Sequence, residues 1–187
     1  KPVDSVIYEV NIRDFTESKD TNIVNKGKFK GFVEENRKTI KGNNKCGLDY
    51  LKYLGISHVQ LLPVTDFYGV DDINTKDSYN WGYDITSFFA LEGSYSSKQA
   101  IPQSRLEEFR EMVDILHKNN IRVVLDMVFN HIYDWQNSSL ENSLPNYYFR
   151  KKKNGELSNA SGCGNDIASE KIMARKVVLA GACRTAI

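Results

Sequence analysis

The sequence predicts an α/β fold built on a parallel β-sheet, and three observations support this prediction. Apolar, β-branched segments at residues 6–12, 56–62 and 121–125 have the composition of strands. Two segments with helical periodicity lie between them, one before Gly55 and one that starts near Ser104. The resulting order of strand, helix, strand, long loop, helix and strand is typical of β-α-β units with right-handed crossovers.

The first part of the chain supplies a loop and a short helix between two strands. Residues 16–43 are rich in Lys, Asn and Gly and lack periodicity, so we expect a surface loop there. Leu48, Leu51 and Leu54 then repeat every third residue, which predicts a helix. Gly55 follows directly and is placed to end that helix in a left-handed conformation.

Residues 64–103 form a connection far longer than the usual loop between a strand and a helix. Long loops inside a domain are usually functional. This one carries Tyr79, Trp81 and Tyr83 within five residues. The three rings either pack the loop on itself or form a stacking wall in a binding cleft, and the sequence leaves both alternatives open.

A second helix is predicted after this loop. Ser104 and Glu107 form a capping box, with the serine at the N-cap. One apolar stripe follows at helical spacing: Leu106, Phe109, Val113 and Leu116. Asn119 and Asn120 are suited to close the helix in a left-handed conformation.

The third strand leads into a group of polar residues. The apolar segment 121–125 predicts a strand buried on both faces. Asp126, Asn130 and His131 follow it, and a carboxylate in an apolar run is costly unless it is hydrogen-bonded. Active sites of α/β folds lie at the carboxyl ends of parallel strands. The alternative is that these residues only tie a loop to the strand end.

Length and composition limit the classes of function. A chain of 187 residues predicts one domain. The net charge is +1, which indicates neither a nucleic acid nor a membrane as partner. No apolar run approaches the roughly 20 residues of a membrane span. We find no signal peptide and interpret Lys1 as an internal cut or a processed end, so a cytoplasmic and a secreted location both stay open. The three cysteines, Cys46, Cys163 and Cys183, fit neither a disulfide framework nor a zinc site.

Six sequence blocks follow one another in a specific order between residues 7 and 176. They are Ile7-Tyr-Glu-Val, Gly47-Leu-Asp-Tyr-Leu with Leu54-Gly-Ile-Ser-His-Val-Gln-Leu-Leu-Pro63, Tyr79-Asn-Trp-Gly-Tyr-Asp84, Glu92-Gly-Ser-Tyr-Ser96, Asp126-Met-Val-Phe-Asn-His131 and Ser161-Gly-Cys-Gly-Asn-Asp166. Together they resemble the first part of the catalytic barrel of α-glucan-acting enzymes in glycoside hydrolase family 13, with the strongest similarity to type I pullulanases. Ile85 departs from the family, which commonly has proline there.

The resemblance implies a TIM (β/α)₈ barrel, of which this chain holds about the first three βα units, with the site at the carboxyl end of the strands. It further implies a pullulanase-like glycoside hydrolase that cleaves α-1,6-glucosidic bonds by a retaining mechanism. The implied substrates are branched α-glucans such as pullulan, starch and glycogen.

The resemblance also assigns roles to residues. Tyr83 stacks on the sugar just before the cleaved bond, His131 hydrogen-bonds that sugar, and Asp126 supports the site from the strand end. Asn80 and Trp81 belong to the same substrate-binding region. No cofactor is required.

Asn130 occupies a position that binds structural calcium in many α-amylases. In the pullulanase branch this calcium is less regular, so the sequence leaves the metal open.

The catalytic carboxylates are expected outside this chain. A retaining glycosidase uses two carboxylates about 5 Å apart. In the family, the nucleophilic Asp lies on the fourth strand, the acid/base Glu on the fifth and a further Asp after the seventh, all beyond Ile187. We therefore expect this polypeptide alone to be inactive, and the alternative function is that of a noncatalytic α-glucan-binding fragment.

The end of the chain differs from the rest. Residues 1–176 correspond to the amino-terminal part of the catalytic domain, whereas residues 177–187 form an atypical tail. The run from Met173 is similar to the first strand of a thiolase but has no thiolase active-site motif. Ordinary divergence and a fused or mis-joined tail are the two alternatives, and we favour the second.

Overall fold

The computed structural model describes residues 4–75, 78–168 and 170–171, and the chain forms two compact units. Unit 1 consists of Lys1–Val64, Gly69–Trp81 and Leu91–Asp126, and unit 2 of Thr65–Tyr68, Gly82–Ala90 and Met127–Ile187. The atypical tail predicted at residues 177–187 lies outside the described residues, so the division at residue 176 stays a prediction.

A parallel sheet of three strands forms the centre of unit 1. Its strands are β1 (Ile7–Val10), β4 (His58–Leu61) and β5 (Arg122–Leu125), in the order β1-β4-β5. Both pairs are parallel and in register, so that Val10 lies beside Leu61 and Leu61 beside Leu125. The prediction of an α/β fold with a parallel sheet is confirmed.

Burial differs between the strands because they differ in position. In the central strand β4, Val59 and Leu61 are fully buried. Strand β5 alternates between exposed and half-buried residues, and Val124 is 37% exposed. The prediction that this strand is buried on both faces is therefore wrong for the described sheet, where β5 lies at an edge.

Helix α3 (Gly47–Leu54) forms as its leucine spacing predicts. Leu48 and Leu51 are fully buried, whereas Leu54 lies at the exposed end of the helix. Gly55 closes the helix at φ 66°, in the left-handed region that favours glycine. The predicted C-terminal glycine is confirmed.

Helix α4 (Pro102–Lys118) begins earlier than predicted. Pro102 occupies the first turn, where its fixed φ is favourable and its missing N–H costs nothing. Ser104 therefore lies inside the helix, where its Oγ donates to the Ile101 carbonyl at 2.7 Å. The predicted capping box at Ser104 and Glu107 is wrong.

The buried face of α4 is also shifted from the predicted stripe. Phe109 and Leu116 are buried as expected, but Leu106 is 44% exposed. Met112, which lies between them at helical spacing, is fully buried. The helix ends near Asn120, whose φ of 60° confirms the predicted left-handed closure.

The segment 16–43 is more ordered than predicted. Helix α1 (Ile12–Thr16) reaches into it, and helix α2 (Phe29–Phe32) follows. Strand β2 (Arg37–Lys38) then pairs in antiparallel fashion with β3 (Lys45–Cys46).

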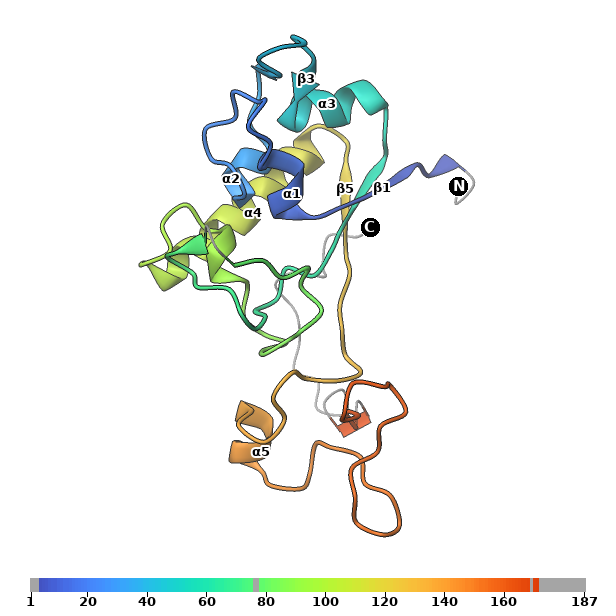
Figure 1. The fold of residues 1–187 in the computed structure, drawn as a ribbon. Helices are drawn as coiled ribbons and strands as arrows, with labels where there is room; N and C mark the ends of the chain where they lie inside the picture. Colours follow the sequence, from blue (N-terminus) through green and yellow to red (C-terminus); the bar gives the residue numbers. More distant parts are fainter. Residues whose placement is uncertain (1–3, 76–77, 169, 172–187) are drawn as a thin grey trace. The chain divides into compact units, whose positions relative to one another are not determined.

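Two phenylalanines explain why this segment is not a surface loop. Phe29 and Phe32 are both fully buried. The Phe29 ring lies 5.4 Å from that of Phe109 on α4, and the Phe32 ring lies 4.7 Å from that of Phe15. Figure 1 shows α1, α2 and α4 gathered beside the strands of unit 1.

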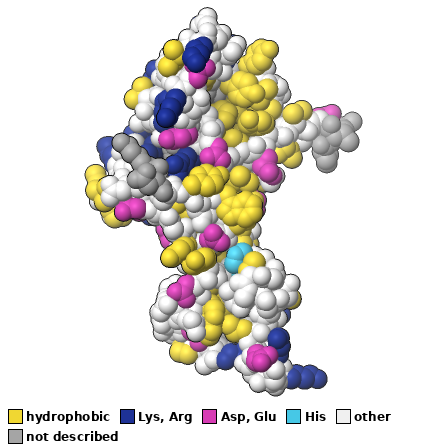
Figure 2. All heavy atoms as spheres, in the orientation of Figure 1, with side chains coloured by type: hydrophobic (Ala, Val, Ile, Leu, Met, Phe, Trp, Pro, Cys, Tyr) yellow, Lys and Arg dark blue, Asp and Glu magenta, His cyan; other side chains and the backbone are white. Residues whose placement is uncertain are grey.

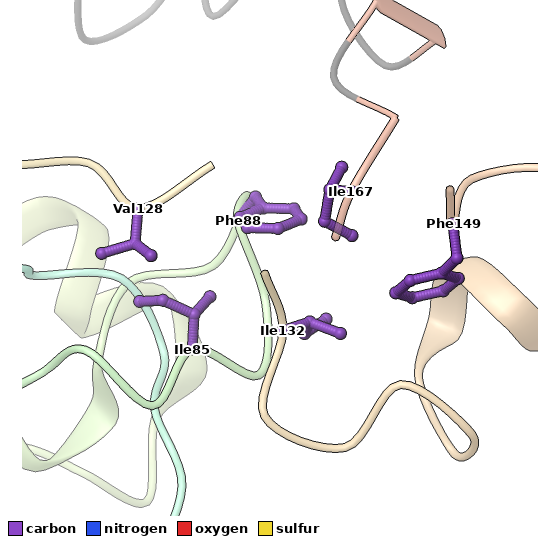
Figure 3. Packing of buried hydrophobic residues seen from close by; sticks show 6 residues of the cluster. All are labelled: Ile85, Phe88, Val128, Ile132, Phe149 and Ile167. Carbon is purple, nitrogen blue, oxygen red and sulfur yellow. The ribbon is translucent and has the colours of Figure 1, made fainter. Parts of the chain in front are cut away.

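Unit 2 is built from loops around its own core. Buried side chains from four stretches of the chain pack together (Figure 3): Ile85, Phe88, Val128, Ile132, Phe149 and Ile167. An antiparallel bridge joins Phe149 to Ile167, and the short helix α5 (Ser139–Ser143) lies in the same unit. The exposed surface carries hydrophobic side chains among charged ones (Figure 2).

Among the described residues, no helix has the length and apolar character needed to cross a membrane.

Candidate functional site

In unit 1, the end of β1 organises the first polar group. Asn11 follows the strand, is buried and caps α1 by accepting from the backbone N–H of Arg13 at 2.8 Å and of Asp14 at 3.2 Å. Its Nδ2 also donates to the Tyr95 hydroxyl at 3.4 Å. The cap therefore determines where the side chains of Arg13 and Asp14 emerge from the strand end.

Arg13 and Asp14 hold the start of the aromatic motif. The Arg13 guanidinium donates to the Ser78 carbonyl at 2.5 Å and lies 5.6 Å from the centre of the Tyr79 ring. The Tyr79 hydroxyl donates to Asp14 Oδ2 at 3.0 Å. Burial and this hydrogen bond raise the pKa of Tyr79. Neither anchoring residue was identified as part of the site from the sequence.

The anchored segment presents its rings to solvent. Tyr79 and Trp81 are each 58% exposed, whereas Asn80 is half-buried. Both alternatives for these rings, a loop that packs on itself and a stacking wall in a binding cleft, stay predictions.

Asp126 lies at the carboxyl end of β5, as predicted. Its N–H donates to the Leu61 carbonyl at 2.9 Å, which continues the ladder with β4 by one residue. The side chain is half-buried. Its position at the strand end is thus observed, whereas its supporting role in a substrate site stays a prediction.

In unit 2, the segment with Tyr83 lies beside the segment with His131. The backbone N–H of Tyr133 donates to the Ile85 carbonyl at 2.8 Å, and these two residues follow His131 and Tyr83 by two positions each. Tyr83 is half-buried and packs against the core of unit 2. Two residues that are 48 positions apart in the sequence therefore come from adjoining segments.

His131 is 9% exposed, and a neighbouring amide orients its ring. Its Nδ1 lies 3.0 Å from Asn130 Oδ1. Because an amide oxygen can only accept, Nδ1 carries the proton in this pair. In the neutral ring, Nε2 is then an acceptor that is suited to a sugar hydroxyl.

The glycine-rich block at residues 161–166 supports the segment that contains His131 through hydrogen bonds of Asn165. Asn165 accepts from the Ile132 N–H through Oδ1 at 3.1 Å and donates to the Ile132 carbonyl through Nδ2 at 2.8 Å. Asn165 is 1% exposed, and Ile132 follows His131 directly. From the sequence this block was a family marker, and nothing in it indicated which residue it would hold.

Asp166 closes the turn that carries Asn165. Its carboxylate accepts from the Ser158 hydroxyl at 2.5 Å and from the backbone N–H groups of Ala160 at 2.7 Å and Ser161 at 2.8 Å. The Ser158 hydroxyl is the largest cause that lowers the pKa of Asp166, and the backbone donors lower it further. The turn is thus held by an ionised side chain.

A metal site needs several ligating groups close together in space. No three His, Cys, Asp or Glu side chains within the described residues are grouped so that they could hold a metal ion. Calcium takes about six to eight oxygen ligands, several of them from carboxylates. Asn130 Oδ1 meanwhile lies against the His131 ring. Structural calcium and Asn130 as its ligand stay predictions.

The structure distributes the predicted site residues over both units. Tyr83, Asn130 and His131 belong to unit 2, where their segments adjoin. Asn80, Trp81 and Asp126 belong to unit 1.

Comparison with known proteins identifies the family. Residues 14–168 match the family model described as the catalytic domain of alpha amylase. The chain is 49% identical over 177 residues to the pullulanase of Bacillus subtilis strain 168. This match covers 95% of this chain and 24% of that relative.

Solved structures support the same family. The crystal structure of pullulanase type I from Bacillus subtilis str. 168 complexed with maltose matches 94% of this chain and 24% of its own, with a TM-score of 0.88 and 49% identity. A pullulanase from Paenibacillus barengoltzii in complex with maltohexaose and alpha-cyclodextrin matches 94% of this chain and 28% of its own, with a TM-score of 0.89 and 38% identity. The chain spans about a quarter of the length of these relatives. The predicted resemblance is confirmed: the chain belongs to the α-amylase family, glycoside hydrolase family 13, and it is similar to type I pullulanases.

Proposed function

We propose that this chain is part of a pullulanase-like glycoside hydrolase that cleaves α-1,6-glucosidic bonds in branched α-glucans with retention of the anomeric configuration. One observation carries the proposal: the 49% identity to the Bacillus subtilis pullulanase extends over 95% of this chain. Pullulan, starch and glycogen are the proposed substrates. Complexes of related pullulanases with maltose and maltohexaose support a glucan as ligand.

The three parallel strands are, in this proposal, the first three of an eight-stranded (β/α)₈ barrel. Each strand of such a barrel is followed by a helix, and the loops at the carboxyl ends of the strands build the site. The order β1-β4-β5 follows the order of the chain, as the first strands of a barrel do.

The proposed roles of the site residues are those that the family resemblance implies. The Tyr83 ring stacks on a glucosyl unit, and Nε2 of His131 accepts a hydrogen bond from a hydroxyl of that unit. Asp126 supports the site from the strand end, while Asn80 and Trp81 contact the glucan from the anchored segment. The chemistry needs no cofactor, because the two-carboxylate mechanism uses only protein groups and water.

A noncatalytic glucan-binding role is the alternative for the 187-residue polypeptide. The observation that favours it is that the chain spans 24% of the Bacillus subtilis relative. The family resemblance assigns the nucleophile and the acid/base to strands beyond those described.

One experiment separates these functions. The complete protein is incubated with pullulan, and products and first-released anomer are followed by chromatography and NMR. Cleavage at α-1,6 bonds releases maltotriose as its α-anomer, whereas products of α-1,4 cleavage or a β-anomer would reject the proposal. The 187-residue polypeptide is measured in parallel: binding without release of reducing sugar supports the alternative for this part of the chain, and turnover would show that the catalytic groups are misassigned.

A further inference from the structure

Two tyrosines of unit 2 form a stacked pair at the surface. The ring centres of Tyr68 and Tyr133 lie 4.0 Å apart, and the ring planes differ by 14°. Tyr68 is 52% exposed and Tyr133 is 46% exposed. Their segments meet only in the folded chain, because 65 positions separate them in the sequence.

Both rings are positioned by the same short stretch of backbone. The Tyr68 N–H donates to the Asp84 carbonyl at 2.9 Å, and the Tyr133 N–H donates to the Ile85 carbonyl at 2.8 Å. Two consecutive carbonyls thus hold the two segments, and Tyr83 precedes them directly. The two segments that carry the pair are therefore hydrogen-bonded to the segment that carries Tyr83, the ring that the proposed function assigns to sugar stacking.

Buried residues make this arrangement rigid. Phe67, next to Tyr68, is 5% exposed and forms an antiparallel bridge with Ile85. On the other side, Ile132 precedes Tyr133 and is held by both ends of the Asn165 amide. Because the support is already ordered, the protein loses less conformational entropy when a ligand binds.

The pair lies at the surface, outside the set of buried side chains that forms the core of unit 2. About half of each exposed tyrosine therefore remains in contact with water, which is unfavourable for the apolar faces of the rings. A glucosyl unit offers an apolar C–H face to such a ring and hydroxyls to its polar edge.

An exposed carboxylate adjoins Tyr133 in the sequence. Asp134 follows Tyr133 and is exposed. Hydrogen bonds from the Asn137 side chain and backbone lower its pKa, so it is ionised at neutral pH. An exposed, ionised carboxylate accepts hydrogen bonds from sugar hydroxyls.

We propose that Tyr68 and Tyr133 form a second aromatic platform that binds a further glucosyl unit of the α-glucan beside Tyr83. This inference rests on the proposed function, because it names an additional contact for the same class of ligand. The platform binds substrate and takes no part in bond cleavage.

The test measures binding of maltotetraose to the 187-residue chain by isothermal titration calorimetry. Tyr68→Ala and Tyr133→Ala remove one ring each, and Tyr68→Leu keeps apolar bulk without a flat face. Tyr68→Phe and Tyr133→Phe keep the stacked rings. Tyr53→Ala is the matched control, because Tyr53 is 71% exposed and lies on α3 in unit 1.

We expect Tyr68→Ala, Tyr68→Leu and Tyr133→Ala each to weaken binding about tenfold, by analogy with the loss of base–aromatic stacking. The Phe variants and Tyr53→Ala should stay within about twofold of the parent chain. Thermal melting of each variant shows whether it folds. If both Ala variants have a lowered melting temperature, the affinity of the Tyr68→Leu variant decides, because leucine retains an apolar contact with Tyr133.

Tyr83→Ala separates this inference from the proposed function. If Tyr83→Ala weakens binding while the Tyr68 and Tyr133 variants bind like the parent, the platform is rejected and the proposed function stands. If the parent chain binds no maltotetraose, the proposed glucan binding fails and the platform fails with it.

Discussion

Asn165 holds Ile132 through both ends of its side-chain amide, although 33 residues separate them. Oδ1 accepts from the Ile132 N–H at 3.1 Å, and Nδ2 donates to the Ile132 carbonyl at 2.8 Å. The side-chain amide thus satisfies both backbone groups of Ile132, which a neighbouring strand would satisfy in a sheet. The residue before Ile132 is His131, so this pairing determines where the imidazole is presented.

The first prediction concerns this pairing. Asn165→Ala leaves a buried N–H and a buried carbonyl without partners, so we expect a loss of about 1–3 kcal/mol in the free energy of unfolding. Urea denaturation measures it. Asn142→Ala is the control, because Asn142 is exposed and its side chain donates to the Asn137 carbonyl at 3.2 Å. Equal losses for both variants would contradict a specific role of Asn165.

The second prediction concerns acid stability. The pKa of Asp166 is lowered in the folded chain, chiefly by the Ser158 hydroxyl. A lowered pKa stabilises the fold fully above the unfolded value of about 3.9, and this contribution disappears as the pH falls below it. Asp166→Asn removes the titrating group, so the variant should lose less unfolding free energy than the parent between about pH 6 and pH 3. Chemical denaturation of both proteins at pH 6 and pH 3 measures the difference. If the parent and the variant lose the same unfolding free energy, Asp166 does not contribute to the acid sensitivity of the fold.

The third prediction concerns the anchor at the end of β1. Arg13→Met removes the hydrogen bond to the Ser78 carbonyl and the cation that lies against the Tyr79 ring, so the segment with Trp81 should become more mobile. In a Trp135→Phe background, Trp81 is the single tryptophan of the chain. Its quenching by acrylamide and its fluorescence anisotropy report this change.

Arg110→Met is the matched control for this experiment, since Arg110 is exposed on α4. The exposed contacts of Tyr79 contribute less than about 1 kcal/mol to stability, so the melting temperature should change little. Increased quenching with an unchanged melt identifies Arg13 as a positioning residue. Unchanged quenching and anisotropy would show that Arg13 does not order the aromatic motif.

Local rules predicted the elements whose signal lies within a few residues. The leucine spacing of α3 and its glycine end needed only one helix turn of sequence to be recognised. The strands were recognised by their apolar, β-branched composition, and their order followed from the β-α-β alternation.

Features that depend on competing local signals were harder to predict. Ser104 and Glu107 fit a capping box, but the helix starts three residues earlier, at Pro102, because the fixed φ of proline is already helical. In the Lys- and Asn-rich segment, Phe29 and Phe32 bury themselves against α4 and α1. The apolar side chains of this segment are too irregularly spaced to give a periodic signal.

The candidate site was predictable in its residue types but not in its supports. The position of Asp126 at a strand end and the closeness of the Tyr83 and His131 segments followed from the rule for parallel strands and from the resemblance. The contacts of Asn165 with Ile132 and of Asp14 with Tyr79 span 33 and 65 residues. No local pattern encodes contacts over such distances, so they required coordinates.

The last prediction concerns Tyr83 and His131 in the complete enzyme acting on pullulan. Tyr83→Ala removes a stacking surface that serves the bound substrate as well as the transition state, so we expect KM to rise and kcat/KM to fall by the equivalent of about 1–3 kcal/mol.

His131→Ala should act differently if the hydrogen bond from Nε2 strengthens as the sugar distorts toward the transition state. An interaction that strengthens there lowers kcat more than it raises KM when it is lost. Asn130→Ala provides the matched comparison, because it removes the group that orients Nδ1 at 3.0 Å while leaving the imidazole in place. We expect its effect on kcat to have the same direction as that of His131→Ala but to be smaller. Steady-state kinetics on pullulan measures both. A His131→Ala enzyme with unchanged kcat and a raised KM would mean that the imidazole contributes only to substrate binding, and an Asn130→Ala enzyme with parental kinetics would mean that the ring needs no partner at Nδ1.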